Sequence, residues 1–295
     1  MCSSNTFHHH VHDDERVDRA RGLLCEGASL LVQTQESADI IDSSRHLQQC
    51  LDKFDCALRL APHLRAHAWE RGFVLLYLNR IKEAADQFAY CTSLDPDDCE
   101  PFLWRSLCVA KLQGWNAGLA VLDQFHGYDN RLCMMEVLAL YKGKTNLESV
   151  FDCACGDPHS AARASFACAL FFEAHGTREA EKMSLPLLHA VATVHCGGDT
   201  YLQSLARIHM RHVQDSLHSI HAHAQDGRRT PLSCGFPSSP TASTVSSPAA
   251  LASPTALGTE IADEKGRKYD TPSVPLCSRA AKAAVLRRAL VKNSC

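Results

Sequence analysis

The sequence predicts an all-α protein whose helices pair along the chain. Apolar residues recur at helical spacing through residues 14–225, and no stretch shows the alternation of a half-buried strand. Two similar phrases, ALRLAPH at 57–63 and CTSLDPD at 91–97, place Pro62 and Pro96 34 residues apart. A fixed period of this length indicates a helical repeat, because each unit buries its apolar face only against its neighbours.

The clearest unit begins at residue 65 and has the residue types that two crossing helices need. Counting from there, Gly72 is at position 8, Ala84 at 20, Phe88 at 24 and Pro96 at 32. The repeat pattern requires small residues at positions 8 and 20, where the paired helices touch, and a large residue at position 24. Asn79 is expected to end the first helix, because Asn tolerates the left-handed conformation.

Partial units flank this one. The preceding unit keeps its second half, with Phe54 at position 24, Ala57 at 27 and Pro62 at 32. Its first helix is expected over residues 15–34, with Gly27 as the small residue, and a unit starting at Cys99 follows. This pattern resembles the tetratricopeptide repeat (TPR), and the order of the parts is similar to NlpI-like TPR adaptor proteins. The resemblance implies an α-solenoid of about three and a half helix-turn-helix repeats.

Composition divides the chain into four parts. Residues 1–13 are polar and His-rich and are expected to be a disordered tail, followed by the helical domain at 14–225. Residues 226–277 form a Ser/Pro-rich linker that contains too little apolar surface to fold. Residues 278–295 are expected to form a short basic helix and the terminus. In the linker, candidate phosphorylation sites precede prolines at Thr230, Ser239, Ser247, Ser253 and Thr271.

In TPR proteins the inner helices line a concave groove that binds a partner. The positions that match this groove are unusually aromatic and apolar: Trp69, Phe73, Tyr77, Trp104, Leu107 and Lys111. They predict a groove for a peptide or helix of another protein. The alternative is that the C-terminal helices fold back and bury this face. A clamp for chaperone C-terminal carboxylates is not expected, because the positions that need Lys and Asn carry Trp69, Phe73 and Trp104 instead.

No motif points to catalysis, a cofactor or a metal. The P-loop, dinucleotide-binding, nucleophile-elbow and HExxH patterns are all absent from the sequence. The closing helix at 200–225 has histidine pairs, but His209/His212 and His218/His221 point to opposite sides and are interpreted as a solvated polar face. Cys153 and Cys155 have no second thiol pair at zinc-finger spacing.

The overall balance of residues limits the function further. The 295 residues carry a net charge of −3, which does not favour nucleic acid, and no apolar run is long enough for a membrane span. No secretory signal is recognised, so the 15 cysteines are expected to be free thiols of a cytoplasmic protein. The prediction is a non-catalytic adaptor or scaffold. The alternative is a structural subunit of a larger multiprotein assembly.

Overall fold

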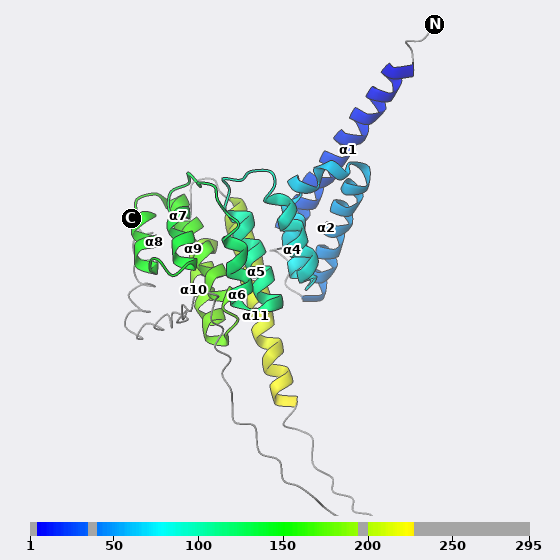
Figure 1. Ribbon diagram of the computed structural model, residues 1–295. Helices are drawn as coiled ribbons and strands as arrows, with labels where there is room; N and C mark the ends of the chain where they lie inside the picture. Colours follow the sequence, from blue (N-terminus) through cyan, green and yellow to red (C-terminus); the bar gives the residue numbers. More distant parts are fainter. Residues whose placement is uncertain (1–4, 35–39, 194–199, 227–295) are drawn as a thin grey trace, which may run out of the picture. The chain divides into compact units, whose positions relative to one another are not determined.

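The computed structural model describes residues 5–34, 40–193 and 200–226, and within these ranges the chain is helical with no strand (Figure 1). The all-α class predicted from the sequence is therefore confirmed. The described residues up to Ser219 belong to one compact unit, which contains every feature discussed below. The Ser/Pro-rich stretch after residue 226, its five candidate phosphorylation sites and the basic segment 278–295 lie outside the described residues.

The helices follow one another with short connections. The N-terminal half contains α1 (Asn5–Gln33), α2 (Ile40–Leu60), the 3-10 helix η2 (Pro62–His67), α3 (Trp69–Tyr77), α4 (Ile81–Cys91), α5 (Glu100–Gln113) and α6 (Trp115–Leu122). The C-terminal half contains α7 (Met134–Tyr141), α8 (Leu147–Cys153), α9 (Pro158–Ala174), α10 (Arg178–Thr193) and α11 (Thr200–Asp226).

Neighbouring helices pack in pairs, and a glycine lies at the crossing point of the first two pairs. In the pair α1–α2, a Cβ on Gly27 would stand 3.0 Å from the ring of Phe54. In the pair α3–α4, a Cβ on Gly72 would stand 2.6 Å from the ring of Phe88. The same glycine-under-phenylalanine contact thus occurs in both pairs, at the glycines expected as the small residues of their units; Phe54 and Phe88 are 34 residues apart, whereas the longer connection before α2 puts Gly27 and Gly72 45 residues apart.

The predicted end of α3 at Asn79 is confirmed, and the start of α9 has a side-chain cap. Asn79 has a φ of 59°, and the N–H of Arg80 donates to the carbonyl of Leu75 at 2.8 Å, which closes α3. At the start of α9 the Asp157 carboxylate accepts from the N–H of Ser160 at 2.9 Å. Both residues satisfy backbone groups that the helix ends leave without partners.

Two helix starts differ from the prediction. The unit expected from Arg65 begins with the 3-10 helix η2, and the α-helix starts only at Trp69, because Ala68 has a non-helical backbone (φ −93°, ψ 55°). Residues 1–13 were expected to be a disordered tail, whereas α1 begins at Asn5. Residues 5–13 contain neither Gly nor Pro, so no helix-breaking residue interrupts this first part of α1.

The C-terminal helices α9 and α11 close over α3 and α5. Trp69 on α3 contacts Tyr201 on α11 with ring centroids 6.0 Å apart, and Trp104 on α5 contacts Phe166 on α9 at 5.6 Å. In Figure 1, α11 accordingly runs alongside α5. Most of the buried apolar side chains form one continuous core that joins α3, α5, α9 and α11.

Candidate functional site

The face predicted to be an open groove is largely covered. Phe73 and Leu107 are fully buried, and Trp104 is only 3% exposed. The prediction of an open groove is wrong at these three residues, and the alternative of a face buried by the C-terminal helices describes them correctly. The physical reason is that α9 and α11 offer enough apolar surface to bury a face that would be costly to leave in water.

Tyr77 also belongs to this covered region. Its ring lies 5.8 Å from that of His209 and 5.2 Å from that of His212, both on α11. Its hydroxyl oxygen is buried and has no hydrogen-bond partner within the described part of the chain. Burial raises the pKa of Tyr77 well above its usual value, and the nearby Glu173 carboxylate adds to the effect. Tyr77 is therefore neutral and packs, partly buried, against the core.

Lys111 points into the same interior and forms an ion pair there. Its Nζ lies 2.9 Å from Oε1 of Glu173, while the other carboxylate oxygen, Oε2, lies 2.8 Å from Nε2 of His209. Glu173 and His209 are 2% and 0% exposed. Burial alone would raise the pKa of Glu173, but the charges of His209 and Lys111 outweigh it and hold the pKa well below its usual range. Glu173 therefore stays ionised.

This cluster corrects the interpretation of the histidines on the closing helix. His209 was expected on a solvated polar face, but it packs against Trp104 at 5.2 Å and Phe166 at 5.7 Å. The next histidine on this side, His212, is half-buried, and its pKa falls to about 4 because of burial and the neighbouring His209. His218, by contrast, is exposed.

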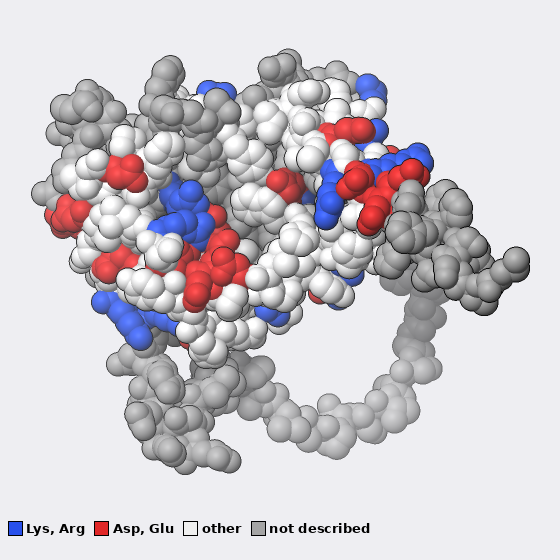
Figure 2. Space-filling model, turned by 90° about the horizontal axis from the view of Figure 1, so that it is seen from above, with Lys and Arg blue, Asp and Glu red and all other residues white. Residues whose placement is uncertain are grey.

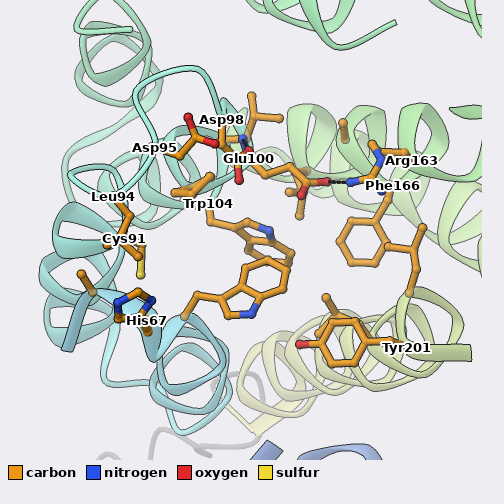
Figure 3. A pocket seen from close by; sticks show the side chains of 18 residues that line it. His67, Cys91, Leu94, Asp95, Asp98, Glu100, Trp104, Arg163, Phe166 and Tyr201 are labelled. Carbon is orange, nitrogen blue, oxygen red and sulfur yellow. Dashed lines mark hydrogen bonds and ion pairs between the residues drawn. The ribbon is translucent and has the colours of Figure 1, made fainter. Parts of the chain in front are cut away.

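An open pocket remains beside the covered face. It has a volume of about 500 Å³ and lies between η2, α3, the α4–α5 connection, α5, α9 and the first turns of α11. Four aromatic side chains from four different helices line it: Trp69, Trp104, Phe166 and Tyr201. Figure 3 shows Trp104, Phe166 and Tyr201 around the cavity, with His67 and Cys91 on another side.

Charged residues border one edge of this pocket. Glu100 accepts from Arg163 at 2.7 Å and from Arg131 at 2.9 Å, and Arg131 also pairs with Asp98 and Asp129. Burial would raise the pKa of Asp129, but hydrogen bonds from Arg131 and from the N–H of Cys99 lower it to about 2. Asp95 lies in the connection between α4 and α5, and its Oδ1 accepts a hydrogen bond from the N–H of Asp97 at 3.0 Å.

The side chains of the pocket show little sign of nucleophilic chemistry. Cys91 is buried, and burial raises the pKa of its thiol to about 11, so it is protonated at neutral pH. On the face seen in Figure 2, Lys and Arg lie beside Asp and Glu, and the described residues form no continuous basic area there. Cys153 and Cys155 are exposed at the end of α8. No group of three or more potential metal ligands gathers among the described residues.

The pocket contains two residues of the predicted groove and several that the sequence did not point to. Trp69 and Trp104 were predicted from the repeat positions. Phe166, Tyr201 and Arg163 were missed, because they come from α9 and α11 and meet the pocket only through tertiary packing. The remaining signature residues are structural: Ala57 and Ala84 are fully buried, whereas Pro62 is exposed at the start of η2 and Pro96 in the turn between α4 and α5.

The fold and this site together define the class of protein: an all-α protein with an aromatic pocket at the edge of its core. No protein-family model matches the chain, and no curated protein matches it in sequence. None of the helices in the described part of the chain is both long and apolar enough to cross a membrane.

Proposed function

We propose that this chain is a non-catalytic adaptor of the TPR type that binds a peptide segment of a partner protein in the aromatic pocket. The observation that carries the proposal is the pocket itself, with Trp69 and Trp104 on its wall. A cavity of about 500 Å³ has the size of a ligand site, and Trp is the residue most enriched among the anchors of binding energy.

The repeat type is supported by a contact that recurs in two helix pairs, whose phenylalanines are 34 residues apart. Gly72 packs under Phe88 as Gly27 packs under Phe54, and Asn79 ends the first helix of its unit with a positive φ. In TPR proteins the first helices of successive units line the binding face. Trp69 and Trp104 are in the first helices of two such units, which is where a partner would be expected.

The pocket, and not the whole inner face, is the proposed binding site because most of that face is occupied by α9 and α11. A partner residue with a large apolar side chain would enter beside Trp69, with its neighbours lying over the rim at Leu94, which is 48% exposed. Burying one such side chain contributes about 1.5–3 kcal/mol. Binding to this site is therefore expected to depend on one or two anchor residues.

The proposed location and regulation of the protein depend on features of the sequence. We place the protein in the cytoplasm, where free thiols persist; every cysteine among the described residues is a free thiol.

Phosphorylation of the Ser-Pro and Thr-Pro sites between residues 230 and 271 would add about −1.5 to −2 charges each and would regulate binding. The alternative of a subunit packed permanently through its aromatic face has less support, because the chain's own helices occupy most of that face.

The test is to fill the pocket without touching the core. Ala66 lines the pocket and is half-buried, so Ala66→Phe places a ring in the cavity. Ala89 on α4 is equally half-buried but lies outside the pocket, which makes Ala89→Phe the matched control. The full chain and both variants are used as baits, and the captured proteins are compared by quantitative mass spectrometry.

We expect a set of proteins that the wild-type chain and Ala89→Phe retain and that Ala66→Phe loses. The melting temperatures of the three chains should agree, because neither alanine is fully buried. Identical capture by all three chains would remove the pocket as the binding site. Loss of capture together with a collapsed melting temperature in Ala66→Phe would mean that the residue supports the fold instead.

A further inference from the structure

The edge of the pocket carries more negative than positive charge. Asp95, Asp97, Asp98, Glu100 and Asp129 contribute five carboxylates around the α4–α5 connection, and the arginines bound to them are Arg131 and Arg163. Both arginines form ion pairs with Glu100, and Arg131 also forms ion pairs with Asp98 and Asp129. The net charge of this group is therefore negative.

Two of these carboxylates have no ion pair within the described residues. Oδ1 of Asp95 accepts only from the N–H of Asp97 at 3.0 Å, and Oδ1 of Asp97 accepts from the N–H of Tyr128 at 2.8 Å. Figure 3 shows Asp95 and Asp98 on one side of the pocket, with Arg163 on the other. A cation that enters the pocket is therefore expected on the side of Asp95, away from Arg163.

The interior of the pocket has a different character from this edge. Beside the four aromatic rings it is lined by Leu103, Leu170, Leu202 and Leu205. A peptide that matches both the apolar interior and the acidic edge of the pocket has apolar side chains next to Lys or Arg, and few or no acidic residues. A Lys or Arg near the face of Trp69 would add a cation–π attraction to the pairing with the carboxylates.

The chain itself contains a segment with this composition. Residues 278–292 read SRAAKAAVLRRALVK, with five cations and no acids, and apart from Ser278 all the others are Ala, Val or Leu. The connection between α11 and this segment is roughly 50 residues, and a flexible chain of that length spans about 40 Å on average. The segment is therefore tethered within reach of a pocket on the same molecule.

We propose that the segment 278–292 docks in the aromatic pocket of its own chain and competes there with the partner. The inference rests on the proposed function, because it assigns a regulator to the same site. A tether of this length gives an effective concentration near the millimolar range, so a segment that binds on its own with a Kd of about 100 µM occupies most of the pockets. A partner must then bind more tightly than the segment or arrive when the segment has been released.

Tryptophan fluorescence reports on this docking directly. Two of the chain's three tryptophans, Trp69 and Trp104, line the pocket, whereas Trp115 is stacked on His175 at 4.0 Å outside it. In a Trp115→Phe background the emission comes from the pocket alone. Acrylamide, an uncharged quencher, then measures how accessible the indoles are; the change is expected at the half-buried Trp69, because Trp104 is only 3% exposed. The comparison is repeated without Trp115→Phe, so that a loss of stability in that background does not decide the result.

The test compares the full chain with a full chain in which Arg279, Lys282, Arg287, Arg288 and Lys292 are replaced by Gln. Neutralising the segment should raise the acrylamide quenching constant about twofold, because the pocket is no longer occupied. Salt at 1 M should do the same to the unmodified chain by screening the charges. A synthetic peptide of residues 278–292, added to the neutralised chain, should restore the protection, whereas its all-Gln counterpart should not.

Equal quenching in the two chains, whatever the effect of the added peptide, would overturn intramolecular docking. Protection by the all-Gln peptide as well would overturn the role of charge. Neither result touches the proposed function, which fails only if filling the pocket with Ala66→Phe leaves partner capture unchanged. The two failures are therefore distinguishable.

Discussion

Gly72 on α3 lies directly under the ring of Phe88 on α4, so close that a Cβ on the glycine would stand 2.6 Å from the ring. Phe88 is fully buried, and its ring also contacts Phe73 at 5.5 Å and Trp104 at 6.0 Å. The contact therefore fixes the distance between two helices and the position of the aromatic core that backs the pocket.

The first prediction concerns this contact. Gly72→Ala is expected to destabilise the fold by about 1–3 kcal/mol, because the new methyl group overlaps the Phe88 ring and the surrounding core leaves it little room to move. The matched control is Gly22→Ala on α1, where a Cβ would have nothing within 4 Å. That change should be neutral or stabilise by up to about 1 kcal/mol, since alanine favours a helix more than glycine does. Urea unfolding of both variants measures the difference, and equal effects would contradict the contact.

The second prediction tests whether Lys111 lies in the core or in a solvated groove. Lys111→Met is expected to destabilise the fold by roughly 3 kcal/mol, because it removes the lysine ammonium group that pairs with the buried Glu173 carboxylate. The control is Lys82→Met, whose ion pair with Asp86 is largely exposed and should contribute less than about 1 kcal/mol. Thermal melts of the two variants decide the question. A stable Lys111→Met chain would place the lysine in a solvated groove.

The third prediction is an acid-induced loss of stability through His212. Its pKa is about 4 in the folded chain, lowered from 6.5 by burial, and it is ordinary in the unfolded chain. Between these two values the unfolded chain binds a proton that the folded chain does not. The free energy of unfolding therefore falls as the pH drops from about 6.5 to 4, by about 3 kcal/mol in all.

Urea unfolding at several pH values between 7.5 and 4.5 measures this slope. His212→Gln should flatten it, because no proton binds there in either state. His218→Gln, at an exposed position of the same helix, should leave it unchanged. Glu173 adds to the loss only at lower pH, since its lowered pKa keeps the folded chain unprotonated there while the unfolded chain takes up a proton. A slope unaffected by His212→Gln would show that other groups cause it.

The fourth prediction compares two tyrosines whose hydroxyl groups are buried. Tyr141 donates from its hydroxyl to the carbonyl of Ala167 at 3.1 Å, whereas the buried hydroxyl of Tyr77 has no partner among the described residues. Tyr141→Phe should therefore cost about 1 kcal/mol, and Tyr77→Phe should be neutral or slightly stabilising. Melting temperatures of the two variants test this order, and the reverse order would contradict the positions of the two hydroxyl groups.

The sequence by itself determined the features that depend on residues close together in the chain. The repeat pattern predicted Gly72 as a small residue where paired helices touch, and the turn at Asn79 was predicted from a single residue. These features are local, because the partners are within one helical hairpin and small, large and turn residues have steric requirements that any such hairpin must meet.

Tertiary structure alone decided what covers the inner face and where the pocket lies. Helical periodicity identifies Phe73 and Leu107 as residues of an apolar face, but it does not tell which helix will bury them. The partners are far away in the chain: Glu173 meets both Lys111 and His209, and Phe166 and Tyr201 complete a pocket begun by Trp69 and Trp104. Hydrophobic burial is non-directional, so an apolar face accepts a partner protein or its own chain equally well, and only the path of α9 and α11 settles which part stays open.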